Sequence, residues 1–282
     1  MKLDLGTFLV QCAAGGMLFC WVTTRRREVS LGYGWLLRIV YGLLAIGGAV
    51  ALLANDHTVA GAGAILCAAM CAIGLAVSVV RRKAGVGVGA AMMAERKARV
   101  AAMVGREDAP VDEPPTGPEF PPVLDLAAGV VGMLTMLACA TFAGGPYALA
   151  AARLLVGAAF LGSVTDAMLL GHWYLVQPGL RRDPIKELVV WTGAVWPFEI
   201  LVFLWPVGMV SVLNGTIDDG YNGLLGWVWV TCAVTTIGLV VMTWFALKER
   251  AYSAVMAATG LLYLAILTAF GVDLIARAVL TP

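Results

Sequence analysis

The sequence predicts an all-α, polytopic integral membrane protein with eight transmembrane helices. Of its 282 residues, 61% are hydrophobic and only 13% are charged, and the mean hydropathy is +0.88. Soluble domains are about 45–50% apolar and about 25% charged, so a soluble enzyme, a disordered chain and a fibrous repeat are excluded. Eight apolar stretches reach the length of about 20 residues that a helix needs to cross the hydrocarbon core, and none alternates like a β-barrel strand.

The expected spans follow one another along the chain at 5–24, 33–54, 58–80, 123–144, 147–176, 187–213, 223–246 and 252–276. The first is interpreted as a retained span rather than a signal peptide, because Lys2 is offset by Asp4 and the basic cluster follows the apolar run. The chain thus divides into a three-span unit at 1–83, a loop at 84–122 and a five-span bundle at 123–282. The first part of the loop is expected to form either an interfacial amphipathic helix or a short solvated helix. The second part is acidic and proline-rich and is expected to be an extended linker.

The basic residues predict the orientation of the chain. Lys and Arg occupy alternate loops at 25–27, 81–83, 181–186 and 248–250, whereas the loops at 55–57, 144–145 and 214–222 contain none. The positive-inside rule places the basic loops in the cytoplasm and both termini outside, and Trp and Tyr residues near the span ends agree. The Ala/Gly/Arg-rich composition suggests a bacterial inner-membrane protein with the lipid bilayer as a partner. The net charge of +1 supplies no field that would attract nucleic acid.

Ionisable residues inside spans are the best functional candidates, because one at the membrane centre costs at least about 2.5–3.5 kcal/mol. Asp166 and Glu199 are expected at matched depth on adjacent spans, about 17 Å from the cytoplasmic boundary. If their faces turn toward each other, the two carboxyls cannot both ionise cheaply, which suits a proton route or ion coupling. The alternative is structural: each acid bonds a neighbouring helix, or one of them pairs with Arg153 or Arg38.

The other charged residues have simpler interpretations. Arg38 lies near the inner boundary, where it can snorkel, and Asp125 lies at a helix N-terminus, where the helix dipole favours an anion. Asp273 and Arg277 stand four residues apart near the outer end of the last span and are expected to pair. Arg153 is expected to join that pair or to snorkel.

An aromatic cluster with one histidine lies near the cytoplasmic boundary. His172, Trp173 and Tyr174, together with Arg38, are candidates to contact a quinone or a partner-borne haem. For His172 itself, anchoring at the membrane interface is the favoured interpretation. The other histidine, His57, falls in a loop on the opposite side, which argues against a bis-histidine haem within this chain.

The cysteines all lie in apolar runs, which do not suit a disulfide framework. Cys67 and Cys71 are four residues apart on one helical face. They are either a metal or redox pair or small residues that let two helices approach closely, and we favour the second, so no metal site is predicted.

No P-loop, zincin motif or nucleophile elbow occurs in the sequence, and three functions remain open. The first is a membrane subunit of a larger complex associated with electron transport, with a quinone or cofactor site near the cytoplasmic interface and Asp166 and Glu199 as a proton route. Its partners would be other membrane subunits. The second is a proton-coupled transporter of a small solute that uses the same two acids. The third is a non-catalytic membrane scaffold or assembly protein.

Overall fold

The computed structural model describes residues 4–84, 118–177, 180–206, 208–249 and 251–280, and these form helices and short connections. Eight of the described helices are long and apolar enough to cross a membrane, as the sequence predicts. They are α1 (Leu5–Thr24), α2 (Leu31–Ala54), α3 (Thr58–Val80), α5 (Val123–Ala140), α6 (Tyr147–Val176), α7 (Asp183–Leu204), α9 (Leu224–Ala246) and α10 (Tyr252–Val279). The other two helices in the described residues are short: η1 (Arg82–Ala84) and α8 (Met209–Leu213).

The sixth span differs most from its prediction. A single helix over 187–213 is expected, but α7 starts earlier, with Pro184 in its first turn, and ends at Leu204. Proline has a fixed φ that suits a helix start, whereas Pro206 offers no backbone N–H and disfavours helix in the residue before it. α8 then forms a separate turn of helix before the loop at 214–223. Pro197 lies inside α7, and the helix continues through it.

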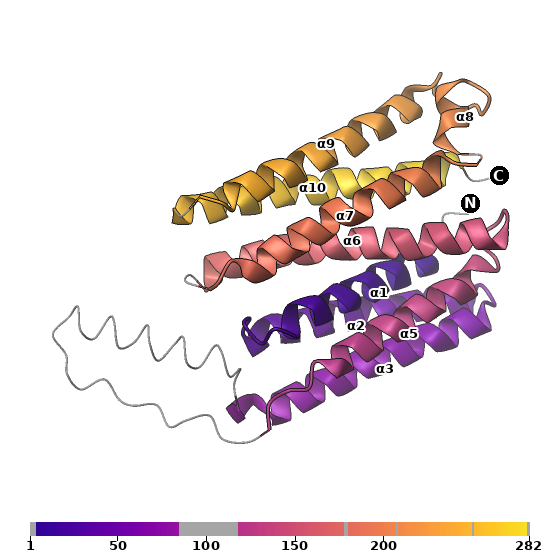
Figure 1. Cartoon of the computed structure of the whole chain (residues 1–282). Helices are drawn as coiled ribbons and strands as arrows, with labels where there is room; N and C mark the ends of the chain where they lie inside the picture. Colours follow the sequence, from indigo (N-terminus) through magenta and orange to yellow (C-terminus); the bar gives the residue numbers. More distant parts are fainter. Residues whose placement is uncertain (1–3, 85–117, 178–179, 207, 250, 281–282) are drawn as a thin grey trace, which may run out of the picture.

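The eight long helices pack as two four-helix units (Figure 1). In the first unit, α1 and α3 each contact α2 and α5; in the second, α6 and α9 each pack against both α7 and α10. The units meet chiefly where α1 lies against α6. The division at 1–83, 84–122 and 123–282 therefore describes the order of the chain rather than its packing, because α5 packs with the helices that precede the loop. The amphipathic helix predicted within the loop lies outside the described residues.

Glycines allow α1 to approach its neighbours closely. A Cβ atom on Gly15 would overlap the backbone of Ala158 on α6, and one on Gly162 of α6 would overlap the backbone of Gly15. A Cβ atom on Gly129 of α5 would lie 2.8 Å from the backbone nitrogen of Leu18. Small residues at these crossings let the backbones touch, which is how helices without a hydrophobic driving force between them associate in lipid. α1 is therefore the central helix of the bundle.

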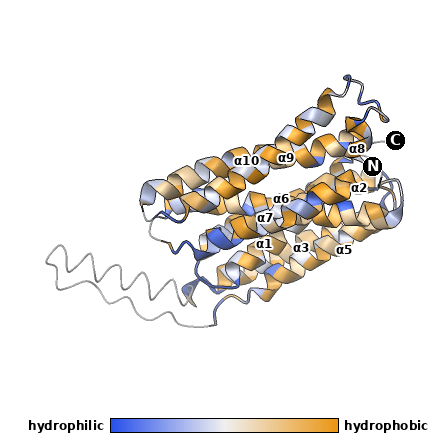
Figure 2. Cartoon of the chain, turned by 45° about the horizontal axis from the view of Figure 1, so that its top comes forward, coloured by the Kyte–Doolittle hydropathy of each residue, from blue (hydrophilic) through white to orange (hydrophobic). Residues whose placement is uncertain are grey.

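The loops that carry the basic residues lie together at one end of the bundle, here called the basic end. Contacts join all four: Arg25 and Arg26 to Glu187, Arg181 to Glu28, Arg27 and Arg81 both to Glu119, and Arg182 to Ala251. α1 begins and α10 ends at the opposite end (Figure 1). Figure 2 shows apolar colour along the sides of the helices, and most of the hydrophilic colour near their ends. This distribution fits a bundle whose flanks face lipid.

Candidate functional site

Asp166 lies on α6, facing the first unit, and is completely buried. Its Oδ1 accepts a short hydrogen bond from the hydroxyl of Tyr41 on α2, and Tyr33 donates to its backbone carbonyl at 3.2 Å. Its Oδ2 has no hydrogen-bond partner within the described parts of the chain. The charged group that acts on it electrostatically is another acid, Asp125. Among the described residues, no basic side chain binds this carboxyl group to compensate a negative charge.

A glycine on α1 makes the contact between Tyr41 and Asp166 geometrically feasible. α1 packs against both α2 and α6, so Tyr41 must pass it to reach Asp166. The ring of Tyr41 occupies the place where a side chain at Gly16 would begin, since a Cβ atom there would overlap the ring. Gly162, one helical turn before Asp166 on α6, packs against Gly15. Adjacent glycines on α1 thus bring α6 close on one side and admit the tyrosine on the other.

Glu199 is also completely buried, but it belongs to a different cluster. Asp273 and Arg277 of α10 form the expected ion pair, with Arg277 Nε 2.7 Å from Asp273 Oδ2, and these two groups act electrostatically on Glu199. Gln11 of α1 donates to Asp273 Oδ1 at 3.3 Å, which ties the cluster to the first unit. Neither carboxyl oxygen of Glu199 has a hydrogen-bond partner among the described residues.

Arg153 lies beside this second cluster. Its Nε donates to the backbone carbonyl of Val202 at 2.8 Å, its guanidinium stands 5.6 Å from the ring centre of Phe203, and Arg277 acts on it electrostatically. The arginine therefore joins the Asp273–Arg277 region, the first of its two expected arrangements.

The two candidate acids differ in depth as well as in partners. Asp166 lies ten residues before the end of α6 at Val176, and Glu199 lies sixteen residues after the start of α7 at Asp183, both counted from the basic end. At about 1.5 Å per residue, the acids lie about 15 Å and about 24 Å along their helices. The structure thus does not bring them together as one carboxyl pair: Asp166 meets Tyr41, and Glu199 meets Asp273 and Arg277.

Arg38 does not snorkel as expected, because it is only 2% exposed and forms a bidentate ion pair with Asp125. Nε and Nη2 donate to the two carboxylate oxygens at 2.7 and 2.8 Å, and Thr24 adds a third hydrogen bond at 2.9 Å. The guanidinium also lies 4.1 Å from the ring centre of Phe120. Asp125 occupies the first turn of α5, as predicted, and the pair joins α2 to α5 near the basic end.

The four residues predicted to contact a cofactor point to separate partners. His172 is exposed, and its Nδ1 lies 3.1 Å from the hydroxyl of Tyr263 on α10. The indole of Trp173 donates to Ser30 at 3.0 Å, and the hydroxyl of Tyr174 donates to the backbone carbonyl of Arg181. Arg38 is held by Asp125. The structure therefore gives each of these side chains a separate partner and does not bring them together.

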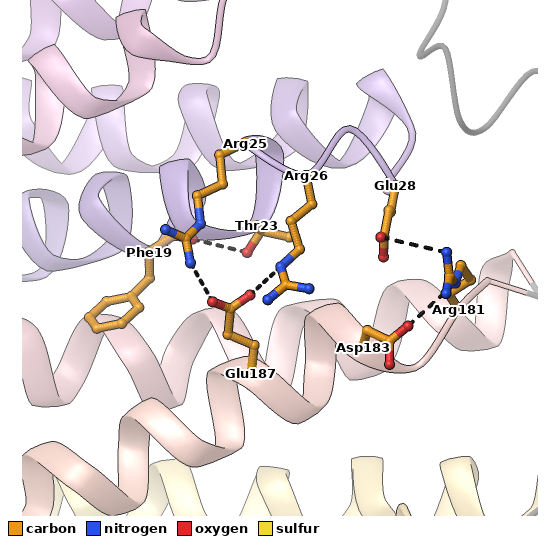
Figure 3. A network of polar contacts seen from close by, with 8 residues as sticks. All are labelled: Phe19, Thr23, Arg25, Arg26, Glu28, Arg181, Asp183 and Glu187. Carbon is orange, nitrogen blue, oxygen red and sulfur yellow. Dashed lines mark hydrogen bonds and ion pairs between the residues drawn. The ribbon is translucent and has the colours of Figure 1, made fainter.

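A layer of charged residues covers the basic end where the two units meet (Figure 3). Arg25 and Arg26, which follow α1, both pair with Glu187 near the start of α7. Arg181 lies between Glu28 and Asp183, at 3.9 and 3.3 Å. Ion pairs between partly exposed side chains contribute at most about 1 kcal/mol each to stability. The layer therefore affects the relative orientation of the two units more than their stability.

Cys67 packs against α5, where its thiol lies 3.5 Å from the carbonyl of Ala128 and 3.4 Å from the position of a Cβ atom on Gly132. Cys71 is likewise buried, and a Cβ atom on Gly42 of α2 would lie 3.3 Å from its own Cβ. Both positions are helix contacts lined by small residues, which supports the packing interpretation of this pair.

Sequence reasoning missed Tyr41 altogether. Its hydroxyl is the polar partner of Asp166, but a tyrosine in an apolar run has the same pattern as any core aromatic residue. The only hint in the sequence is the pair of adjacent glycines on α1. Such a pair indicates a close helix crossing but does not show which side chain fills the space. Comparison with known proteins adds no assignment, since no family model, no curated protein and no solved structure matches the chain.

Proposed function

We propose that this protein moves protons within the membrane and couples that movement to transport of a small solute, with Asp166 as the group that takes up and releases the proton. The observation that carries the proposal is the setting of Asp166. It is completely buried, its Oδ2 has no partner among the described residues, and Tyr41 is the group that orients it. Acids inside membrane spans typically mark proton relays and coupling sites, because an uncompensated charge there is costly.

The position of Asp166 between the two units supports this proposal. Contacts across the unit boundary occur at three depths: Gln11 with Asp273, Tyr41 with Asp166, and Ser30 with Trp173. A carboxyl that changes charge at such a boundary changes the free energy of the contact between units. A transporter needs this kind of link, since coupling requires that the ion bind two arrangements of the protein with different affinity.

Glu199 serves in the proposal as a second coupling group nearer the opposite end. Its neighbours Asp273 and Arg277 hold a compact charge cluster that one added or lost proton would unbalance. Gly157 leaves room for this cluster, because a Cβ atom there would lie 2.8 Å from Asp273 Oδ1. A proton on Glu199 would be released toward the end at which α10 terminates.

The proposed setting is the inner membrane of a bacterium, with the basic end in the cytoplasm and both termini outside. This orientation is supported by the basic loops, which lie together at one end. Basic loops are typically cytoplasmic, and anionic lipids of the cytoplasmic leaflet attract them. In this orientation Asp166 lies nearer the cytoplasmic end of α6 and Glu199 nearer the outer end of α7.

The experiment uses the full chain reconstituted in liposomes that contain a pH-sensitive dye, with a potassium gradient and valinomycin to impose a membrane potential. Driven by the potential, the wild-type protein is expected to conduct protons at a low uncoupled rate even without its solute and so to change the internal pH, and Asp166→Asn is expected to abolish the change. Ser163→Ala is the matched control, because Ser163 is a buried polar residue on the same helix that donates to the carbonyl of Phe160. Unchanged proton movement in Asp166→Asn and in Glu199→Gln would overturn the proposal. Loss of folded yield in both variants, with no activity in any variant, would favour a scaffold instead.

A second candidate is the membrane subunit of an electron-transfer complex. The observation that favours it is the His172–Tyr263 ring pair, which lies on the exposed flank of α6 and α10, where a partner subunit or a quinone can reach it. The absorption spectrum, lipid extract and co-purifying chains of the protein purified in mild detergent test this candidate. Quinone or a haem-bearing partner that is lost from His172→Ala supports it, and their absence from the wild-type preparation contradicts it.

A further inference from the structure

A pocket at the basic end lies between the C-terminal end of α1, the N-terminal end of α2 and the segment that leads into α5. Its lining does not include Asp166 or Glu199. It combines polar side chains, Arg27, Ser30, Arg38 and Glu119, with apolar ones such as Val29 and Pro122. The pocket is partly open, so a ligand can reach it from the interface of the membrane with the cytoplasm.

One wall of the pocket carries a buried donor without a partner. Arg38 is only 2% exposed, and its Nη1 has no hydrogen-bond partner among the described residues, although Nε and Nη2 are bound to Asp125. Nη1 lies over Gly34, where a Cβ atom would stand 2.8 Å from it. An unsatisfied buried donor is destabilising, and an acceptor supplied by a bound ion or ligand explains its presence.

Other donors face the same space. Ser30 lines the pocket and accepts a hydrogen bond from Trp173, so its own hydroxyl hydrogen is available to donate. Arg27 also lines it and pairs with Glu119 at 2.5 Å. A ligand that offers several acceptor oxygens can therefore bind more than one of these groups at once.

Among the described residues, the charged side chains that line or adjoin the pocket leave an excess of one positive charge. Three guanidinium groups meet there, from Arg27, Arg38 and Arg81, and the last donates to the backbone carbonyl of Glu119 at 3.0 Å. Two carboxylates oppose them, Glu119 and Asp125. A ligand with one negative charge would neutralise this excess. A ligand with two would leave a net negative charge, and a cation would be repelled.

We infer that this pocket binds a monoanionic phosphate group, as found in a phospholipid headgroup or in free phosphate. Nη1 of Arg38, the hydroxyl of Ser30 and the guanidinium of Arg27 supply the donors, and guanidinium groups match phosphate oxygens in geometry and charge. The apolar lining from Val29, Leu31 and Pro122 suits the glycerol and upper acyl part of a lipid. The site is independent of the proton chemistry proposed for Asp166.

The test compares adjacent arginines. Arg27 lines the pocket, and Arg26 pairs instead with Glu187 (Figure 3), so Arg27→Gln and Arg26→Gln remove the same charge at neighbouring places. Thermal unfolding and native mass spectrometry of the full chain in detergent are measured with dioleoylphosphatidylglycerol, dioleoylphosphatidylcholine and inorganic phosphate as probes. A ligand that binds only the folded state raises the melting temperature in proportion to its affinity.

We expect phosphatidylglycerol to stabilise the wild-type chain, and Arg27→Gln to weaken its apparent affinity about fivefold, with Arg26→Gln close to wild type. Stabilisation by phosphatidylglycerol without stabilisation by inorganic phosphate identifies a lipid headgroup as the source, and equal stabilisation by inorganic phosphate identifies the free anion. Phosphatidylcholine is expected to stabilise less than phosphatidylglycerol, because its choline adds a positive charge beside the same phosphate. Equal loss in both arginine variants, or no stabilisation by either probe, overturns the inference.

A second pair of variants keeps every charge in place. Gly34→Ala narrows the pocket beside Arg38, whereas Gly47→Ala on the same helix places its Cβ atom at an ordinary 3.4 Å from Leu9. Gly34→Ala is expected to reduce the apparent affinity about tenfold, and Gly47→Ala to leave it unchanged. Unaltered binding in a folded Gly34→Ala protein contradicts the site, and if this variant does not fold, the arginine pair decides.

Discussion

The hydroxyl of Tyr41 on α2 reaches past the central helix α1 and donates a hydrogen bond to the carboxyl of Asp166 on α6. Gly16 of α1 leaves the space that the tyrosine ring occupies. This contact connects the two four-helix units at the one buried acid whose electrostatic neighbours, among the described residues, include no cation. The packing of Tyr41 against Gly16 therefore determines whether the carboxyl of Asp166 keeps its hydrogen-bond partner.

Gly16→Ala should separate Tyr41 from Asp166. The added Cβ atom would overlap the ring, and overpacking of a close-packed core costs about 1–3 kcal/mol. We expect a lower melting temperature in detergent and loss of the tyrosine hydrogen bond. Gly238→Ala is the control, because a Cβ atom on Gly238 of α9 meets nothing within 4 Å and alanine is the better helix former. Equal melting temperatures in the two variants would contradict the described crossing.

Tyr41→Phe and Tyr33→Phe remove the same hydroxyl at neighbouring positions. Tyr41 bonds the carboxyl of Asp166, whereas Tyr33 bonds its backbone carbonyl, which does not titrate. We expect Tyr41→Phe to shift the pH at which proton movement is half-maximal, and Tyr33→Phe to leave that pH unchanged. The pH profile of the liposome assay measures the difference. A shift of the same size in both variants would show that the tyrosines act only through packing.

The Arg38–Asp125 pair should be far more sensitive to loss of one partner than to loss of both. Removing one member of a buried ion pair costs about 3–5 kcal/mol, whereas an apolar replacement of both members is often neutral or stabilising. Asp125→Leu is therefore expected to destabilise the chain strongly, and Arg38→Met combined with Asp125→Leu to recover most of the loss. Denaturant unfolding of the single and double variants gives the coupling between them. Additive losses would mean that the two side chains do not depend on each other.

Asp219 in the loop before α9 should make the stability sensitive to acid. Some desolvation opposes its charged form, but the backbone N–H groups of Tyr221, Gly223 and Leu225 outweigh it and hold the pKa of Asp219 below its usual value. A lowered folded-state pKa gives stability that is complete above the usual value of about 3.9 and lost as the pH falls through the folded-state pKa.

Asp219→Ala should therefore lower the melting temperature at neutral pH and flatten its decline in acid. The control is Asp218→Ala, because Asp218 accepts a hydrogen bond from Gly220 and none of the three that Asp219 accepts. The same acid profile in both variants would contradict the role given to Asp219.

Hydropathy and length suffice to predict the long helices, because both follow from the chain alone. The spans 5–24, 58–80 and 147–176 coincide with α1, α3 and α6. The error at 187–213 has a local cause, since an apolar window does not register the missing N–H of Pro206, which separates α7 from α8. Hydropathy thus predicts which segments cross the membrane better than it predicts where a helix is interrupted.

The candidate site was harder to predict, because it depends on rotation about each helix axis. The sequence predicts Asp166 and Glu199 as acids inside spans, and both are completely buried. Their separation does not follow from the sequence, because approximate span ends give only approximate depths, and their partners come from α2 and α10, far away in sequence. Local effects suffice to account for Arg38 and for Asp125 separately, although the two bind one another across helices that the long loop separates.

Infrared difference spectroscopy of the full chain in lipid detects the protonation of Asp166 directly. We expect the carbonyl stretch of a protonated carboxylic acid to appear and disappear in wild-type protein as the pH changes. The Asp166 component of this band should shift in Tyr41→Phe and be missing from Asp166→Asn, where only the component from Glu199 remains. The Ser163→Ala control should keep the wild-type band. The same pH-dependent band in Asp166→Asn as in wild type would show that Asp166 is not the group that takes up and releases the proton.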